Sequence, residues 1–396
     1  LTAKFINKLA SLYIEKLMSF RYNSAKFLDD RLNAMGLFSN NDKSLVLTLQ
    51  SLMKKATFPN SASPLLSLIN LDRARLKKRI LELDITAEIP CAHLQHEFID
   101  HFSELFCNVA DFTDIDLTID INVKRVNRSE KLTQVKQIIM VASGKGGVGK
   151  STTSVNLALA LAHGGAKVGL LDADIYGPSL PTMVGAVQEK PVSKDGKLLD
   201  PVVAHGLHTM SLGFLVDEND ATVWRGPMAS RALGQLIYET QWPTLDYLVV
   251  DMPPGTGDIQ LTMSSDVPVS GAVVVTTPQN LALKDAQKGI SMFDKVKVPV
   301  IGVIENMSYH ECDNCGHHSH LFGEEGGKAL AQSAKVELVG HLPLSGDIGH
   351  DVDNGRPTLI SQPDSSAAKA YLDIAVRCAI NLNKTNQSIP SLIIGE

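Results

Sequence analysis

A glycine-rich stretch between two regular segments constrains the fold of this chain more than any other feature. Ile138–Ala142 predicts a buried strand, and Lys150–Ala162 predicts a helix directly after the loop. The loop fits the pattern G-x-x-x-x-G-K-[ST]. Its residues, all predicted to bind a ligand, are Gly144, Lys145, Gly146, Gly147, Val148, Gly149, Lys150, Ser151 and Thr152. Backbone N–H groups and the helix N-terminus of such a loop surround a polyphosphate, so the stretch predicts a P-loop nucleoside triphosphatase.

Two side chains of this loop have predicted roles, and a third is unusual. Lys150 would bring a positive charge to the phosphates, and Ser151 would offer an oxygen to Mg²⁺. Lys145 stands at the second position of the pattern, where the ordinary phosphate cradle requires no lysine.

Further apolar runs predict the sheet to which this loop belongs. They are nearly continuous rather than alternating, as expected of strands covered by helices on both faces. They are Val168–Leu171, Leu245–Val250, Ala272–Thr276 and Val300–Ile304. The fold class predicted is therefore α/β, with a doubly wound, mostly parallel sheet.

Acidic residues follow two of these strands. Asp172 and Asp174 come at the end of one, and Asp251 ends another, shortly before Asp258. Ligands bind at the carboxyl ends of strands in such sheets. We expect Asp251 to hold Mg²⁺, and Asp174 and Asp258 to orient the attacking water or to form a nucleotide-sensing loop.

Composition divides the chain near residue 130. Of 29 glycines, only Gly36 lies before residue 138, and the net charge is +3 up to residue 137 and −9 beyond it. Alternating strands at Leu81–Ile89 and Ile115–Val123, with a helical apolar stripe between them, predict a small α/β domain. The predicted limits are a helical extension at 1–44, the small domain at 45–126, a linker at 127–136, the P-loop domain at 137–383 and a polar tail at 384–396.

Composition also excludes several classes of protein. A net charge of −6, 44% hydrophobic and 20% charged residues argue against a disordered chain and against a generally basic nucleic-acid binder. The apolar runs are too short to span a membrane. The amphipathic segment 2–18 favours a packed helix over a membrane-surface helix. Five cysteines form no disulfide framework, which favours a cytoplasmic location, and Cys91 and Cys107 are expected in the core.

One pair of cysteines has ligand spacing. Cys312 and Cys315 lie in a loop that continues with His317, His318 and His320. A zinc site would use two of the histidines, although their spacing is cramped. A dithiol redox pair would normally open a helix. An iron–sulfur cluster would need four thiolates, which two copies of the chain can supply. All three interpretations remain open from the residues alone.

Several motifs together resemble the Mrp/ApbC iron–sulfur cluster carriers, which are deviant Walker A ATPases related to MinD and to the nitrogenase iron protein. The resemblance covers about residues 135–380. It is carried by the Lys145-bearing loop, the stretches at 172–179, 224–228, 251–258 and 306–308, and Cys312 with Cys315. The small domain resembles, less specifically, the ferredoxin-like domain of bacterial members.

The resemblance implies an ATP-dependent carrier that transfers a labile cluster from an upstream scaffold to apo-proteins. It implies a homodimer with a shared [4Fe-4S] cluster, in which Lys145 reaches the partner's nucleotide, Asp174 places the water and Asn306 contacts the adenine. We expect no nucleic-acid or membrane partner. The alternatives are a MinD- or ParA-like positioning ATPase and an electron donor like the nitrogenase iron protein.

Overall fold

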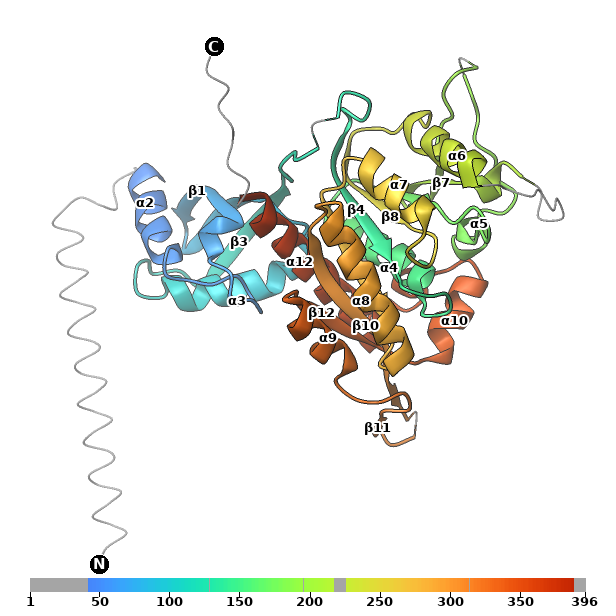
Figure 1. Ribbon diagram of the computed structural model, residues 1–396. Coiled ribbons are helices and arrows are strands. Elements are labelled where there is room, and N and C mark those ends of the chain that lie inside the picture. Colours follow the sequence, from blue (N-terminus) through green and yellow to red (C-terminus); the bar gives the residue numbers. More distant parts are fainter. Residues whose placement is uncertain (1–41, 128, 195, 217–225, 313, 388–396) are drawn as a thin grey trace, which may run out of the picture. The chain divides into compact units, whose positions relative to one another are not determined.

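The computed structural model describes residues 42–127, 129–194, 196–216, 226–312 and 314–387 (Figure 1). The amphipathic helix predicted at 2–18 and the last part of the polar tail lie outside these residues. Contacts within the chain define two compact units. Of the described residues, the smaller unit comprises 42–86 and Leu94–Asp120, and the larger comprises Ala87–His93 and the described residues from Ile121 to Gln387.

In its described residues, the smaller unit has a three-stranded sheet and two α-helices. Its strands β1 (Ile69–Lys77), β2 (Ile80–Ala87) and β3 (Asp114–Ile121) stand in the order β1-β2-β3. Helices α2 (Asp42–Met53) and α3 (Gln95–Phe106) accompany them. Strands β2 and β3 confirm the two strands predicted here, and α3 confirms the predicted helical stripe, since it buries Phe98, Phe102 and Phe106. The sequence did not predict β1 and α2.

One prediction for this unit, that Cys107 lies in the core, is wrong. It directly follows α3 and is exposed, whereas Cys91 is buried as predicted. Because α3 ends at Phe106, the stripe that buries the phenylalanines does not continue to Cys107.

The larger unit is built on a nine-stranded sheet in the order β11-β10-β9-β4-β8-β5-β7-β6, with β12 paired to β10. All pairs are parallel except β6 with β7 and β10 with β11. The strands are β4 (Val135–Ala142), β5 (Val168–Asp172), β6 (Val202–Ala204), β7 (Leu207–Ser211), β8 (Leu245–Asp251), β9 (Gly271–Thr276), β10 (Val300–Glu311), β11 (His318–Ser319) and β12 (Leu338–Pro343).

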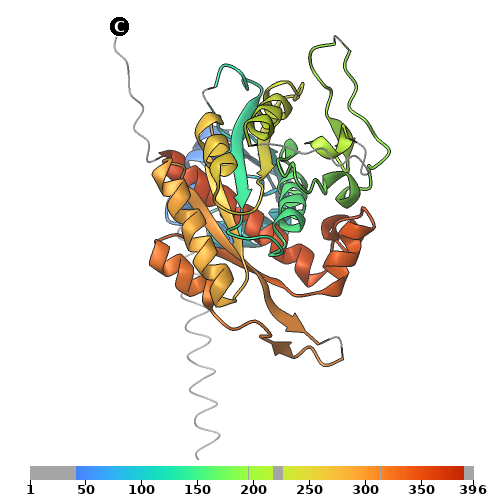
Figure 2. The ribbon, with the colours of Figure 1, turned by 45° about the vertical axis from the view of Figure 1, so that its right-hand side comes forward.

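Helices cover both faces of this sheet (Figures 1 and 2). One apolar core joins Ile139 and Val141 to α4 and α12, and the other joins Ile138 and Met140 to α6, α7, α8 and α9. The helices are α4 (Lys150–His163), α5 (Leu180–Met183), α6 (Gly226–Tyr238), α7 (Asp258–Asp266), α8 (Asn280–Lys295), α9 (Gly326–Ala334), α10 (Gly346–Asp353), α11 (Thr358–Ser361) and α12 (Ser366–Gln387). The doubly wound, mostly parallel fold is confirmed.

Strand β10 differs most from its prediction. It was expected to end at Ile304 but runs on to Glu311, beyond the edge that it shares with β9. Its last residues pair with β11 in an antiparallel hairpin, with His310 opposite Ser319. The polar residues after Ile304 gave no strand pattern, and tertiary contacts hold them extended. The predicted domain limits stay a prediction, although β4 begins at Val135, inside the segment expected to be a linker.

Candidate functional site: the phosphate loop and the cysteine hairpin

The phosphate loop joins β4 to α4, as the sequence predicted. Gly149 adopts a φ of +80° directly before the helix, in the left-handed region that glycine tolerates. A Cβ there would lie 2.2 Å from Asn306 Nδ2. A Cβ on Gly144 would lie 2.1 Å from the backbone of Asp285 in α8. Both glycines are therefore required by close approach of other segments, as well as by the shape of the loop.

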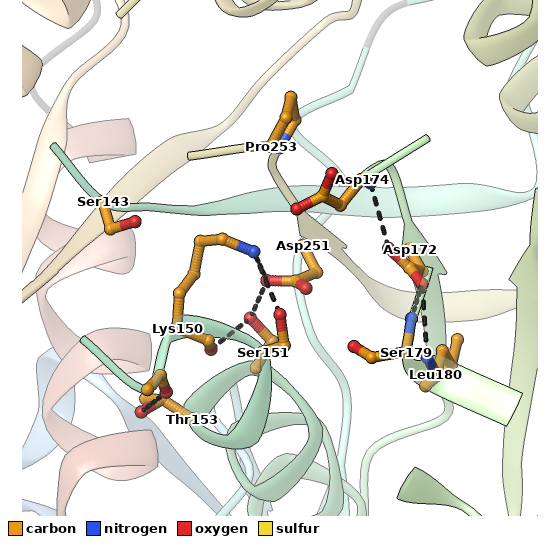
Figure 3. A network of polar contacts seen from close by, with 12 residues as sticks. Ser143, Lys150, Ser151, Thr153, Asp172, Asp174, Ser179, Leu180, Asp251 and Pro253 are labelled. Atoms are coloured by element: carbon orange, nitrogen blue, oxygen red, sulfur yellow. Dashed lines mark hydrogen bonds and ion pairs between the residues drawn. The ribbon is translucent and has the colours of Figure 1, made fainter. Parts of the chain in front are cut away.

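Lys150 and Asp251 form the centre of the site (Figure 3). Lys150 Nζ lies 2.7 Å from Asp251 Oδ1 and 3.1 Å from Ser151 Oγ, and the lysine is only 6% exposed. Ser154 Oγ donates to the same carboxylate oxygen at 2.6 Å. A buried cation and a buried anion can both stay charged when they are paired in this way. The pairing therefore keeps Lys150 and Asp251 charged at the junction of the phosphate loop with α4.

Asp172 lies beside Asp251, because the two residues are partners in adjacent parallel strands. Its carboxylate accepts hydrogen bonds from the backbone N–H groups of Asp174 (3.0 Å), Ser179 (3.1 Å) and Leu180 (3.3 Å). Ser211 Oγ in β7 also donates to it, at 3.0 Å. Asp172 thus holds the loop that carries Asp174. Sequence reasoning placed Asp172 at the strand end but gave it no role.

Burial and the neighbouring charge of Asp251 raise the pKa of Asp172 to about 7. The pKa of Asp174 is also raised, mainly by burial, while Lys150 opposes this shift and Asp251 adds to it. Three carboxylates around a single buried lysine give the site a surplus of negative charge. Such a surplus suits a site that takes up a metal cation along with an anionic ligand.

A cavity of about 570 Å³ lies between the Asp174 loop and the loop after β8. Asp174, Tyr176, Pro254, Asp258 and Gln260 are among its lining residues. Asp258 is exposed in the first turn of α7, and Gln260 Nε2 donates to Pro254 O at 2.6 Å. The structure therefore brings the predicted residues Asp174 and Asp258 to one cavity next to the phosphate loop.

Asn306 contacts the loop from β10, and Lys145 belongs to the loop itself. Asn306 Nδ2 donates to Val148 O at 2.9 Å, so the amide of β10 supports the loop from one side. The carbonyl of Lys145 accepts a hydrogen bond from Ser143 Oγ at 2.9 Å, and Lys145 is partly exposed. Ser154 was missed by sequence reasoning, although its position four residues after Lys150 places both on one helix face.

Cys312 and Cys315 lie elsewhere, in the turn of the β10–β11 hairpin, which extends below the sheet in Figure 1. Cys312 N donates to His317 O at 3.0 Å, and Gly316 N donates to Cys312 O at 2.8 Å. Cys315 is exposed and Cys312 partly so. The rings of Tyr309 and His318 stack at 4.4 Å across the base of the hairpin. The hairpin therefore presents two sulfur atoms at an accessible tip.

Within the residues that the structure describes, no three His, Cys, Asp or Glu side chains are arranged to hold a metal ion. One chain thus offers the two cysteines of the hairpin as a partial ligand set. In the same part of the chain, no helix is both long and apolar enough to cross a membrane.

Comparison with known proteins decides the family. Residues 134–379 match the family model of the NUBPL iron-transfer P-loop NTPase, within the ParA group. The chain belongs to this family. This confirms the predicted class of iron–sulfur carrier P-loop NTPase as well as the fold.

Individual relatives of the NUBPL family agree. The chain is 55% identical to an iron–sulfur cluster carrier protein of Salmonella typhimurium over 282 residues, which are 70% of this chain and 76% of the relative. It is 50% identical to the mouse iron–sulfur cluster transfer protein NUBPL, over 63% of this chain and 78% of that protein. A nucleotide-binding protein from Archaeoglobus fulgidus, solved with ADP, shares 37% identity with a TM-score of 0.54 and covers 61% of this chain and 94% of its own.

Proposed function

We propose that this chain is an ATP-dependent carrier of iron–sulfur clusters that holds its cargo between two copies of itself. One observation carries the proposal: Cys312 and Cys315 lie together in the turn of the β10–β11 hairpin. Strand β10 belongs to the same sheet as β4, the strand that precedes the phosphate loop. A Cys₄ cluster site needs four thiolates, and one hairpin supplies two. Two hairpins related by a two-fold axis complete it, with [4Fe-4S] as the expected cargo.

The phosphate loop would bind ATP with Mg²⁺. Ser151 Oγ and the Asp251 carboxylate are hard oxygen ligands of the kind that Mg²⁺ prefers, and both lie within 3.1 Å of Lys150 Nζ. These residues fit the ion, which would neutralise charge on the phosphates when bound. Lys150 would contact the phosphates, Asp174 and Asp258 would orient water or sense the nucleotide, and Lys145 would reach the nucleotide of the partner copy.

The names of the relatives support the rest of the proposal. A cluster carrier protein and a cluster transfer protein are similar to this chain over 70% and 63% of its length. We therefore expect the chain to receive a cluster from an upstream scaffold and to deliver it to apo-proteins. The sparse cysteines support a reducing compartment, and we place this activity in the cytoplasm.

Anaerobic reconstitution with iron and sulfide tests the cysteine assignment. Cys312→Ala with Cys315→Ala should abolish cluster uptake and transfer to an apo-acceptor. Cys107→Ala is the matched control, because Cys107 is exposed but lies outside the hairpin, and it should behave like the parent. If the double variant holds and delivers a cluster as the parent does, the carrier assignment of this hairpin is wrong. A cluster that is held firmly through redox cycling and never released would favour an electron donor.

A second experiment tests the nucleotide site. Lys150→Ala should abolish ATP hydrolysis, because Lys150 is the positive charge that we expect to contact the phosphates. Hydrolysis at the parent rate in this variant would contradict the assignment of the phosphate loop.

A further inference from the structure

Strand β10 contacts both candidate sites. Asn306, in its middle, is hydrogen-bonded to Val148 of the phosphate loop, and Cys312 follows its last residue. Six residues of extended chain span at most about 20 Å, so the two sites are close neighbours along one strand. Strand β10 is therefore a short, continuous covalent route through which one site can influence the other.

Strand β10 has an irregularity between the two sites, and hydrogen bonds to α9 and β12 hold it in place. In the pairing with β12, Glu305 is opposite His341 and Tyr309 is opposite Pro343, so β10 has two extra residues there. Met307, inside this bulge, has a φ of +55°. A methionine in the left-handed region is held there by its surroundings, since the conformation is unfavourable by itself.

Glu305 is the centre of that bracing. Its side chain is 1% exposed and accepts hydrogen bonds from Ser308 Oγ and from Gly327 N, in the first turn of α9. Ser308 Oγ also lies 2.9 Å from His341 Nδ1 in β12. Because the serine gives its proton to Glu305, it accepts from His341. One buried carboxylate thus connects the bulge of β10 to α9 and to β12.

The electrostatics agree with a carboxylate that stays ionised in this place. Burial alone would raise the pKa of Glu305, but the neighbouring His341 and the hydrogen bonds from Ser308 and Gly327 N lower it below the ordinary value. The positive end of the α9 dipole adds to this effect. The group is therefore a strong acceptor for the donors that surround it.

The other end of the route fits closely against the phosphate loop. The Asn306 amide leaves no room for a Cβ on Gly149, so a displacement of the loop has to move Asn306 or break its hydrogen bond to Val148. Because the residues after Asn306 are braced by Glu305, such a displacement would move the bulge as a unit rather than deform it locally. His320 extends the connection, since its Nδ1 lies 2.9 Å from Ser308 O and His320 follows the second strand of the hairpin.

We propose that Glu305 is a positioning residue that transmits the nucleotide state of the phosphate loop to Cys312 and Cys315. The inference rests on the proposed function for its biological purpose, because it makes cluster retention dependent on the nucleotide. In this role Glu305 contacts neither nucleotide nor cluster. Glu305 acts through the bulge of β10, because its hydrogen bonds fix that bulge between the two sites.

The reactivity of the hairpin thiols reports this coupling without any cluster. In a Cys107→Ser background, Cys312 and Cys315 are the accessible cysteines, since Cys91 and Cys378 are buried. Their alkylation by N-ethylmaleimide would be timed on cluster-free protein, with and without Mg²⁺ and ATP. We expect nucleotide to change the rate roughly five-fold or more in the parent, the range of an ordinary allosteric coupling.

Glu305→Gln should abolish this nucleotide dependence while a fluorescent ATP analogue still binds. The matched control is Glu325→Gln, which makes the same chemical change at the start of the same helix, on an exposed carboxylate that pairs with Lys328. It should keep the parent response. Ser308→Ala is the second variant, to be used if Glu305→Gln does not fold, and it should weaken the response because one brace is lost.

Two results would overturn the inference. One is that the thiols of the parent react at the same rate with and without nucleotide. The other is a parent-sized response in folded Glu305→Gln, or in Ser308→Ala where Glu305→Gln does not fold. The carrier function fails by a different result. If the thiols respond to nucleotide but the protein never takes up a cluster, the coupling stands and the proposed cargo is wrong. If clusters are carried but the thiols do not respond, the opposite holds.

Discussion

Asp251 is the residue on which the electrostatics of the phosphate-loop site depend. It lies beside Asp172, accepts from Ser154 and is paired with Lys150, and all of these groups are buried. With the lysine present, two neighbouring carboxylates are tolerated in the interior. Without it, at least one buried charge would have no counter-ion, which is costly in a protein interior.

This arrangement predicts the stability of two variants. Lys150→Met should lower the free energy of unfolding by about 3–5 kcal/mol, because it leaves the Asp251 carboxylate buried and unpaired. Adding Asp251→Asn should recover much of that loss, since the uncompensated charge is removed. Urea denaturation of the parent, both single variants and the double variant measures the coupling. Additive effects would show that the ion pair is not the source of the loss.

Asp172 predicts a dependence of stability on pH. Its pKa is raised from 3.8 to about 7 in the folded state, so folded chains bind more protons than unfolded chains between these values. Stability from this group is therefore fully present below pH about 4 and is lost as the pH rises towards 7. The change should be on the order of 4 kcal/mol.

Asp172→Asn should flatten this part of the stability curve, whatever it does to the absolute stability. Denaturant unfolding at a series of pH values between about 4 and 7.5 measures the slope. An unchanged slope in the variant would mean that other groups cause the pH dependence.

At the scale of elements, the phosphate loop is shaped by β10 and α8 as much as by its own sequence. Gly149→Ala should destabilise the protein by at least about 1–2 kcal/mol, because alanine is disfavoured at a φ of +80° and its Cβ would collide with Asn306. Gly147→Ala is the matched change in the same loop, because Gly147 has a φ of +79° but no atom lies within 4 Å of the new Cβ, and it should destabilise the protein less than Gly149→Ala. Equal losses in both would show that the contact with β10 is not responsible.

The elements also show what could be predicted from the sequence. The loop, α4 and the carboxylates at the strand ends were predictable, since each depends on a local pattern of strand, glycine and helix. The hydrogen bond from Ser211 to Asp172 was not, because it joins residues 39 positions apart and Ser211 belongs to β7, a short strand with no clear pattern. The contacts of Glu305 were equally hidden, because they join β10, α9 and β12.

At the scale of the whole molecule, the proposed function requires two copies of the chain. Lys145 gives a test that is independent of the cysteines. If Lys145 serves the nucleotide of the partner, Lys145→Ala and Lys150→Ala should each be inactive alone, yet their mixture should recover about a quarter of the parent activity. Random pairing makes half of the dimers mixed, and each mixed dimer has one complete site. ATPase assays of the mixture measure this, and no recovery would show that Lys145 acts within its own chain.

The proposed carrier needs four thiolates from two chains around one cluster, and native mass spectrometry under anaerobic conditions measures this composition. After reconstitution, we expect one species with the mass of two chains and one [4Fe-4S] cluster, and we expect this species to be missing when Cys312 and Cys315 are both replaced by alanine. A metallated species with the mass of a single chain, or one that contains zinc and no inorganic sulfide, would contradict it.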